Sequence, residues 1–181
     1  MEAIRYQFND KKTLNLILYI AERLKRKDFH KIFKILYFAD REFMNAYGMP
    51  ITGDTYIAMD AGPVPSKTYD MLKIVRGDSY IKDQAGLGQF FRVNNWMYVQ
   101  PLRKPDLQAI SPAEKEILDE VIAEYGNLSY DEIKEKSHDT AWRSTARDFP
   151  ISFESMALEA GIDDEDMPYL LETAQLQQAF R

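Results

Sequence analysis

A glycine- and proline-rich segment in the middle of the chain, residues 47–72, constrains the fold more than any other stretch. It reads YGMPITGDTYIAMDAGPVPSKTYDML and sets three glycines and three prolines around one short apolar run. Glycine permits positive φ, whereas proline fixes φ and removes a hydrogen-bond donor. The segment therefore predicts a loop, a short strand over Thr55–Met59 and a turn over residues 61–66. A phosphate cradle, a catalytic elbow and a shaped docking surface are the uses that such a rigid segment suggests.

The residues on either side of this segment follow helical periodicity. Asp28 is a predicted N-cap for the helix before it, and Ser66 for the helix after it. Gly48 is expected to end the earlier helix. The apolar positions of that helix recur at steps of three and four, and they are Phe29, Ile32, Phe33, Leu36, Phe43, Met44 and Tyr47.

The rest of the chain predicts one β-hairpin and several further helices. Residues 90–101 read as a hairpin that turns at two asparagines. Ser111 and Ser129 each begin a capping box, and two amphipathic segments open at Ser152 and at residues 163–166. We therefore expect a mainly α fold with a small β element (α+β): a helical domain with one short strand and a β-hairpin, plus C-terminal helices.

No internal repeat or low-complexity linker divides the chain. We expect residues 1–150 to form one domain and residues 151–181 to form a C-terminal helical extension that packs on it. No stretch approaches the roughly 20 apolar residues that span a bilayer, and no export signal is visible at the N-terminus. These features predict a cytoplasmic protein.

Charge is distributed unevenly along the chain. The net charge is −6, with +4 in residues 1–50 and −11 in residues 111–181. An acidic protein is a poor general ligand for nucleic acid, which requires cationic groups to neutralise phosphates. The acidic final third would suit a basic partner or solubility alone. The chain has no cysteine, which excludes disulfides, thiolate zinc sites and cysteine nucleophiles.

Residues that could support catalysis or cofactor binding are sparse. Gly86 and Gly88 lack the third glycine and the strand–helix context of a dinucleotide loop. The two histidines, His30 and His138, have no partner at metal-ligand spacing, and no hydrolase elbow is present. The sequence therefore predicts neither an enzyme nor a metal or cofactor site.

Asp40 interrupts the apolar stripe of the second helix. A buried carboxylate needs hydrogen-bond donors, and the nearest source is the following loop, residues 48–55. We expect Asp40 to accept hydrogen bonds from that loop and to fix it to the helix, rather than to bind a partner directly. A second face of the helix is predicted to be solvated and basic. It comprises Lys27, Lys31, Lys34 and Arg41.

The same stretch resembles the SocA-like antitoxin family, or Panacea domain, which is also found among phage-associated GepA-like proteins. The resemblance spans roughly residues 10–145 and departs at Asp60 and Ala61, where a basic residue and a larger side chain are expected. It rests on Lys34, Leu36–Asp40, Tyr47, Gly48, Pro50, Ile51, Gly53, Tyr56, Gly62–Ser66, Tyr125, Gly126, Leu128, Ser129, His138 and Trp142.

This resemblance implies a mostly helical fold that acts through protein contact, as an antitoxin that neutralises a cognate toxin encoded by an adjacent gene. The rigid segment would then be a preorganised docking shape or internal architecture that supports a surface elsewhere. The candidate partner-binding or loop-organising residues are Lys34, Tyr37, Asp40, Gly53, Tyr56, Gly62, Pro63, Pro65, His138 and Trp142.

Other interpretations remain open at the level of sequence. The order of elements imitates a winged-helix DNA-binding regulator, although its recognition helix would offer only Lys67 and Lys73, with Asp70 between them. An enzyme would have to combine His138 with Asp139 or with Asp40. Direct neutralisation of a toxin, delivery of the toxin to a protease and formation of a homo-oligomer are all compatible with the sequence.

Overall fold

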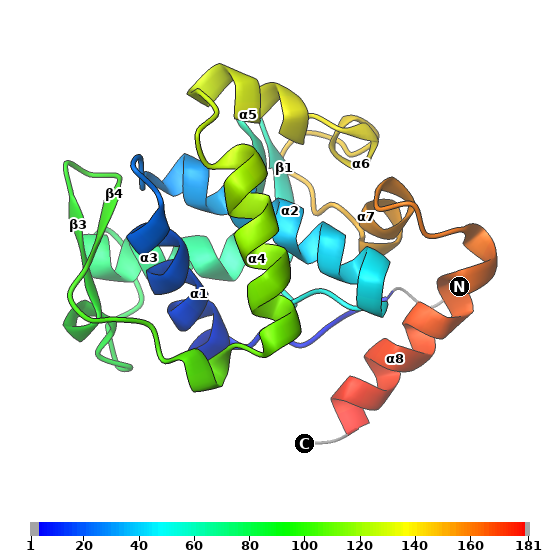
Figure 1. Ribbon diagram of the computed structural model, residues 1–181, viewed down its shortest axis with the longest axis horizontal. Coiled ribbons are helices and arrows are strands. Elements are labelled where there is room, and N and C mark those ends of the chain that lie inside the picture. The colour runs from blue at the N-terminus through cyan, green and yellow to red at the C-terminus, as the bar shows by residue number, and fades with distance from the viewer. Residues whose placement is uncertain (1–3, 180–181) are drawn as a thin grey trace.

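The computed structural model describes residues 4–179, and Figure 1 shows how their helices surround a central one. The predicted fold class is confirmed, because this part of the chain is mainly helical with two small antiparallel sheets. Its α-helices are α1 (Asp10–Arg23), α2 (Phe29–Tyr47), α3 (Ser66–Arg76), α4 (Pro112–Tyr125), α5 (Tyr130–Ser137), α6 (Thr140–Arg143), α7 (Phe153–Glu159) and α8 (Met167–Ala179). Its strands are β1 (Tyr56–Met59), β2 (Gly62–Pro65), β3 (Phe91–Asn94) and β4 (Tyr98–Pro101), and the 3₁₀ turns are η1 (Leu87–Gln89), η2 (Leu107–Ala109) and η3 (Asp164–Asp166).

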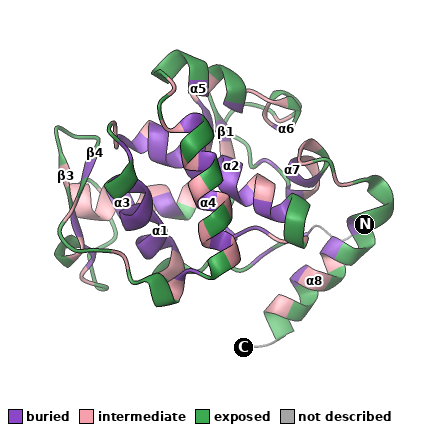
Figure 2. Ribbon diagram, viewed as in Figure 1, coloured by how far each residue is buried: buried purple, intermediate pink, exposed green. Residues whose placement is uncertain are grey.

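Helix α2 forms the centre of the fold. It packs against α1, α4, α5, α7 and β2, and every residue from 31 to 40 is buried, as the purple ribbon of Figure 2 shows. The predicted apolar stripe is therefore part of a helix that is covered on all sides. Tyr47 is the exception, because it lies in the last turn and half of it is exposed.

Most of the predicted caps are confirmed. Asp28 accepts a hydrogen bond from the main chain of the first turn of α2, and both capping boxes are present at Ser111 and Ser129. The prediction for Ser66 is wrong, because Ser66 is already the first helical residue of α3 and Pro65 stands at the cap. A distant carboxylate replaces the missing cap, since Asp54 accepts hydrogen bonds from the first N–H groups of α3.

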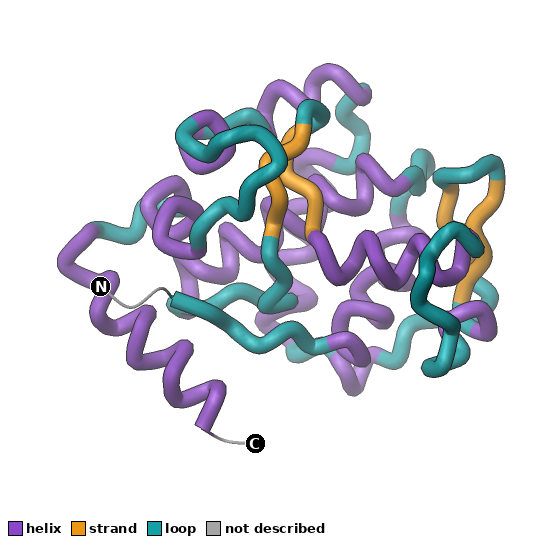
Figure 3. The backbone as a smooth tube through the Cα atoms, turned by 180° about the vertical axis from the view of Figure 1, so that it is seen from behind, coloured by secondary structure: helices purple, strands orange, loops and turns teal. Residues whose placement is uncertain are grey.

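The predicted turn over residues 61–66 is wrong as well. Its central part is strand β2, which pairs antiparallel with β1 in a tight hairpin. A third stretch, residues 148–151, which we call the edge segment, lies on the other side of β1. Its main chain forms hydrogen bonds of 2.8–2.9 Å with Tyr56 and Ala58. Figure 3 shows this hairpin and the separate β3–β4 hairpin in orange.

The alternation of the strand explains the prolines of β2. The backbone N–H and C=O groups of Tyr56 and Ala58 point toward the edge segment. The backbone groups of the alternate residues of β1, Ile57 and Met59, therefore point toward β2, where they pair with Val64 and Gly62. Pro63 and Pro65 therefore stand where the backbone nitrogen faces away from β1. Proline has no N–H to leave unpaired there, so the outer edge of β2 offers no donor to another strand.

The predicted hairpin over residues 90–101 is confirmed, although its turn is shifted. Asn94 pairs with Tyr98, so the loop comprises the three residues between them rather than two asparagines. Asn95 and Trp96 adopt positive φ values of 47° and 67°. This left-handed backbone makes the reversal without a glycine, at a conformational cost that asparagine tolerates better than most residues.

The C-terminal helices share the hydrophobic core of the preceding chain. Phe153 and Met156 of α7 and Leu170 of α8 are buried in the same cluster as α1 and α2. The extended chain before α1 also joins the two ends, because Ile4 N–H donates to Glu154 Oε1 at 2.8 Å. The division of the chain at residue 150 stays a prediction. The outer ends of the two predicted parts, residues 1–3 and 180–181, lie outside the described residues. Within residues 4–179, no helix is long and apolar enough to cross a membrane.

Candidate functional site

The β1–β2 hairpin, together with the loop before it, is the feature around which the candidate residues gather. Side chains from α2 and α6 form hydrogen bonds with its main chain at several points. We call this unit the anchored hairpin and define it as residues 51–65.

Asp40 fixes the start of the anchored hairpin, as the sequence predicted. Its carboxylate is fully buried and accepts hydrogen bonds from the N–H groups of Ile51 (2.8 Å) and Thr52 (2.9 Å). The hydroxyls of Thr52 (2.5 Å) and Tyr56 (2.9 Å) complete the set. Burial raises the pKa of Asp40 to about 6, although these hydrogen bonds act in the opposite direction.

Lys34 fixes β2 from the neighbouring turn of α2. Its Nζ donates to the carbonyl oxygen of Pro63 at 2.8 Å, on the side of β2 that faces away from β1. The amine is fully buried, and burial lowers its pKa to about 7. Gly62 makes this approach possible, because it adopts φ = 95° and a Cβ there would lie 2.9 Å from Lys34 Cε.

These contacts correct the prediction of a solvated basic face on α2. Lys31 and Lys34 are fully buried, and Lys31 Nζ donates to the carbonyl oxygens of Leu128 and, at 3.3 Å, of Tyr125. Those carbonyls lie at and just beyond the end of α4, where a cation is favoured. Arg41 bonds to Asp139 at 3.0 Å. The basic residues of α2 therefore tie other elements to it.

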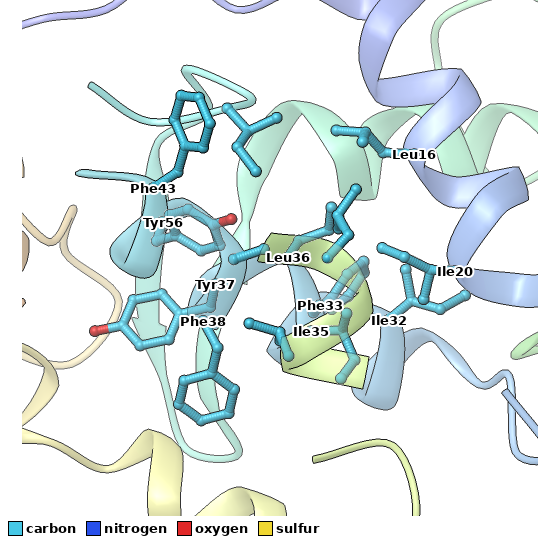
Figure 4. Packing of buried hydrophobic residues seen from close by; sticks show 14 of the residues in the cluster. Leu16, Ile20, Ile32, Phe33, Ile35, Leu36, Tyr37, Phe38, Phe43 and Tyr56 are labelled. Atoms are coloured by element: carbon cyan, nitrogen blue, oxygen red, sulfur yellow. The ribbon is translucent and has the colours of Figure 1, made fainter. Parts of the chain in front are cut away.

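Asp139 connects α2 to α6. It accepts hydrogen bonds from Tyr37 OH (2.7 Å), from Arg41 and from the N–H of Trp142 (3.0 Å). Burial raises the pKa of Asp139 despite these donors. The Tyr37 ring meets the Tyr56 ring edge-on at 5.1 Å, and Figure 4 shows their two hydroxyls pointing in different directions.

His138 and Trp142 hold the tip of the anchored hairpin. Their rings stack with centroids 3.6 Å apart, and Trp142 Nε1 donates to the carbonyl oxygen of Met59 at 3.0 Å. The backbone N–H of His138 bonds to the carbonyls of Lys134 and Glu135, so the histidine closes the last turn of α5. Burial lowers the pKa of its ring.

Gly53 admits the N-terminal chain. It adopts φ = 67°, and a Cβ there would lie only 2.2 Å from the carbonyl oxygen of Gln7. The N–H of Asn9 bonds to the carbonyl of Thr52 at 3.2 Å. This part of the anchored hairpin is consequently covered by residues 4–9.

The structure brings all ten candidate residues to the anchored hairpin or its supports, and it buries most of them. It does not assemble a catalytic group from His138 and its two suggested partners. Asp139 faces α2, Asp40 faces the loop, and His138 stacks on Trp142. Among residues 4–179, no cluster of His, Cys, Asp and Glu could hold a metal ion.

Beside the anchored hairpin lies an apolar groove of about 610 Å³ that the sequence did not predict. Its walls come from the start of α2, from α3, from both hairpin tips and from the start of α5. Phe29 and Phe33 were recognised as apolar, yet their periodicity alone cannot show that one side faces a groove. The main apolar side chains of the lining are Phe29, Phe33, Met59, Tyr69, Met97 and Tyr130.

The rim of this groove carries charged residues at the point where the sequence departs from the family pattern. Asp60, at the tip of the anchored hairpin, pairs with Arg147 at 2.7 Å, and Arg147 also approaches Asp148 at 3.5 Å. All three side chains are more than three-fifths exposed. On α3, which would be the recognition helix in the winged-helix alternative, Lys73 pairs with Asp70 at 2.7 Å.

A family model described as antitoxin SocA-like, Panacea domain, matches residues 32–143. The matched span contains the anchored hairpin and the side chains of α2 and α6 that bond to its main chain. Neither the curated proteins nor the solved structures contained a match.

Proposed function

Because the chain belongs to the SocA-like antitoxin family with the Panacea domain, we propose that it binds a cognate toxin and neutralises it by direct protein contact. The family match over residues 32–143 is the observation that carries this proposal. The toxin is encoded by a neighbouring gene in a bacterial genome or prophage, and the two proteins meet in the cytoplasm. The protein acts by binding, without chemical conversion of its partner.

The anchored hairpin supports a binding role on physical grounds. Asp40, Lys34 and Trp142 bond to three separate points of its main chain, and two prolines restrict the backbone between them. A surface that is already ordered loses little conformational entropy when a partner docks, so more of the contact energy appears as affinity. Asp40 and Lys34 are fully buried, so they lie beneath this surface and support the partner contact.

Co-expression with the neighbouring gene tests the proposal. The two proteins are placed under separate inducers, growth is scored, and the amount of toxin is followed by immunoblot. We expect the neighbour alone to arrest growth and this protein to restore it while the amount of toxin stays constant. A fall in toxin would indicate delivery to a protease instead.

A paired substitution tests whether the rigid hairpin matters. Replacing Pro63 and Pro65 by alanine should weaken rescue, whereas Pro105→Ala, in a loop far along the chain from the hairpin, should leave it unchanged. A harmless neighbour, or continued arrest while both proteins are soluble, contradicts direct neutralisation. Duplex DNA binding with a steep salt dependence would then support a regulator.

A further inference from the structure

The groove beside the anchored hairpin combines an apolar floor with an acidic rim. Phe29, Phe33 and Tyr69 form the floor, and their rings contact one another at centroid distances of 5.5–6.2 Å. Met97 and Tyr130, on the walls, are exposed by 46% and 40%. When an apolar group displaces water from between such side chains, the free energy of the complex is lowered.

Charge pairing within the lining leaves one carboxylate uncompensated. Arg26 bonds to Asp28 at 2.6 Å, and this aspartate also caps α2, so the pair is already satisfied. On the opposite rim a single cation, Arg147, serves both Asp60 and Asp148. The groove therefore favours an incoming cation at the tip of the hairpin.

His30 adds no positive charge to balance this rim. Its Nε2 lies 3.1 Å from the carbonyl oxygen of Ala61, and its ring stacks on Tyr130 at 4.1 Å. Burial and the nearby Lys34 lower the pKa of the ring to about 4, so it is neutral at pH 7. The imidazole thus serves as a flat wall that links α2, the hairpin tip and α5.

We propose that this groove is the docking site for a segment of the toxin that presents an apolar side chain together with a lysine or arginine. The apolar group enters between the aromatic rings, and the cation joins Asp60 and Asp148 at the rim, where Arg147 alone balances only one of the two carboxylates. Methylene groups of lysine and arginine also pack well on tyrosine faces. This inference rests on the proposed function and specifies the chemistry of the partner.

Charge complementarity favours this occupant over the other candidates. A second copy of the chain carries a net charge of −6 and would bring another acidic rim against the first. Nucleic acid would place phosphates against Asp60 and Asp148. A basic, apolar protein segment satisfies both the floor and the rim.

Calorimetric titration with the purified product of the neighbouring gene tests the inference. Asp60→Lys should weaken binding by at least about tenfold at low salt, the effect of placing like charges opposite each other. Glu165→Lys makes the same change of charge in η3, outside the groove, and should stay within about twofold of the wild type. Tyr130→Ala should also cost about tenfold, because a buried aromatic contact is lost.

A charge reversal on the toxin makes the test specific. Changing the docking lysine or arginine of the toxin to glutamate should restore binding to Asp60→Lys while weakening binding to the wild type. Equal thermal midpoints for all variants establish that they are folded. If Asp60→Lys and Tyr130→Ala bind and rescue growth like the wild type, the groove is not the docking site, although the antitoxin function stands. If the wild type itself neither binds nor rescues, the proposed function fails and this inference fails with it.

Discussion

Replacing Gly62 by alanine tests whether close contact with α2 and α5 sets the position of the anchored hairpin. Gly62 has φ = 95°, and a Cβ there would lie 2.4 Å from Ser137 Oγ and 2.9 Å from Lys34 Cε. Both neighbours are fully buried, so neither side chain can move into solvent. Positive φ costs an L-residue about 1–2 kcal/mol, and overpacking a core adds about 1–3 kcal/mol. We expect Gly62→Ala to lower the free energy of unfolding by about 2–5 kcal/mol.

Gly77 offers a matched control for the backbone contribution. Its φ is 92°, and a Cβ there would have nothing within 4 Å. Gly77→Ala should therefore show only the cost of positive φ, about 1–2 kcal/mol. Urea unfolding of both variants, followed by circular dichroism, measures the difference that contact alone produces.

Removing the obstructing hydroxyl should relieve part of the clash. Ser137→Ala deletes Oγ, which otherwise donates to the carbonyl of Lys134 at 2.8 Å. In combination with Gly62→Ala, we expect the double variant to be more stable than the sum of the single effects by about 1 kcal/mol. The reasoning is refuted if Gly62→Ala is as stable as Gly77→Ala, or if the two substitutions are additive.

Four further measurements address the anchors. Asp40→Ala should lower the free energy of unfolding by about 2–5 kcal/mol, because two buried N–H groups lose their acceptor; a loss below 1 kcal/mol in urea would contradict this. The pKa of Asp40 is raised to about 6 in the fold, so ionisation removes stability as pH rises from about 4 to 7. Over that range the free energy of unfolding of the wild type should fall relative to that of Asp40→Asn, which has no group that ionises there. The pKa of Lys34 is lowered to about 7, so its stabilising contribution is lost as pH falls toward 7; Lys34→Met should therefore be less destabilising at pH 7 than at pH 9.5. Trp142→Phe removes the hydrogen bond to Met59 and should cost about 0.5–1.5 kcal/mol, with the stack on the histidine retained.

Part of the candidate site was predictable because its chemistry is local. Asp40 stood out as a carboxylate on an apolar stripe, and the only rich source of donors nearby was the loop that follows. The two prolines of β2 were visible as well, yet they were interpreted as a turn. Proline is compatible with β2 only where its nitrogen faces away from β1. The edge segment occupies the other side of β1 and so sets which residues of β1 face β2, yet it lies about 90 residues further along the chain.

The sequence by itself determined the helices, most of their caps and the predominance of α structure, because periodicity and most capping are set by residues within about four positions of one another. Only the tertiary structure decided what Lys31 and Lys34 do. A lysine on a helix is solvated or buried according to what packs over it. Here the carbonyl that accepts a hydrogen bond from Lys31 lies 97 positions away, and the one that accepts from Lys34 lies 29 positions away. The groove arises in the same way, because its walls are distant in sequence and meet only when the chain has folded.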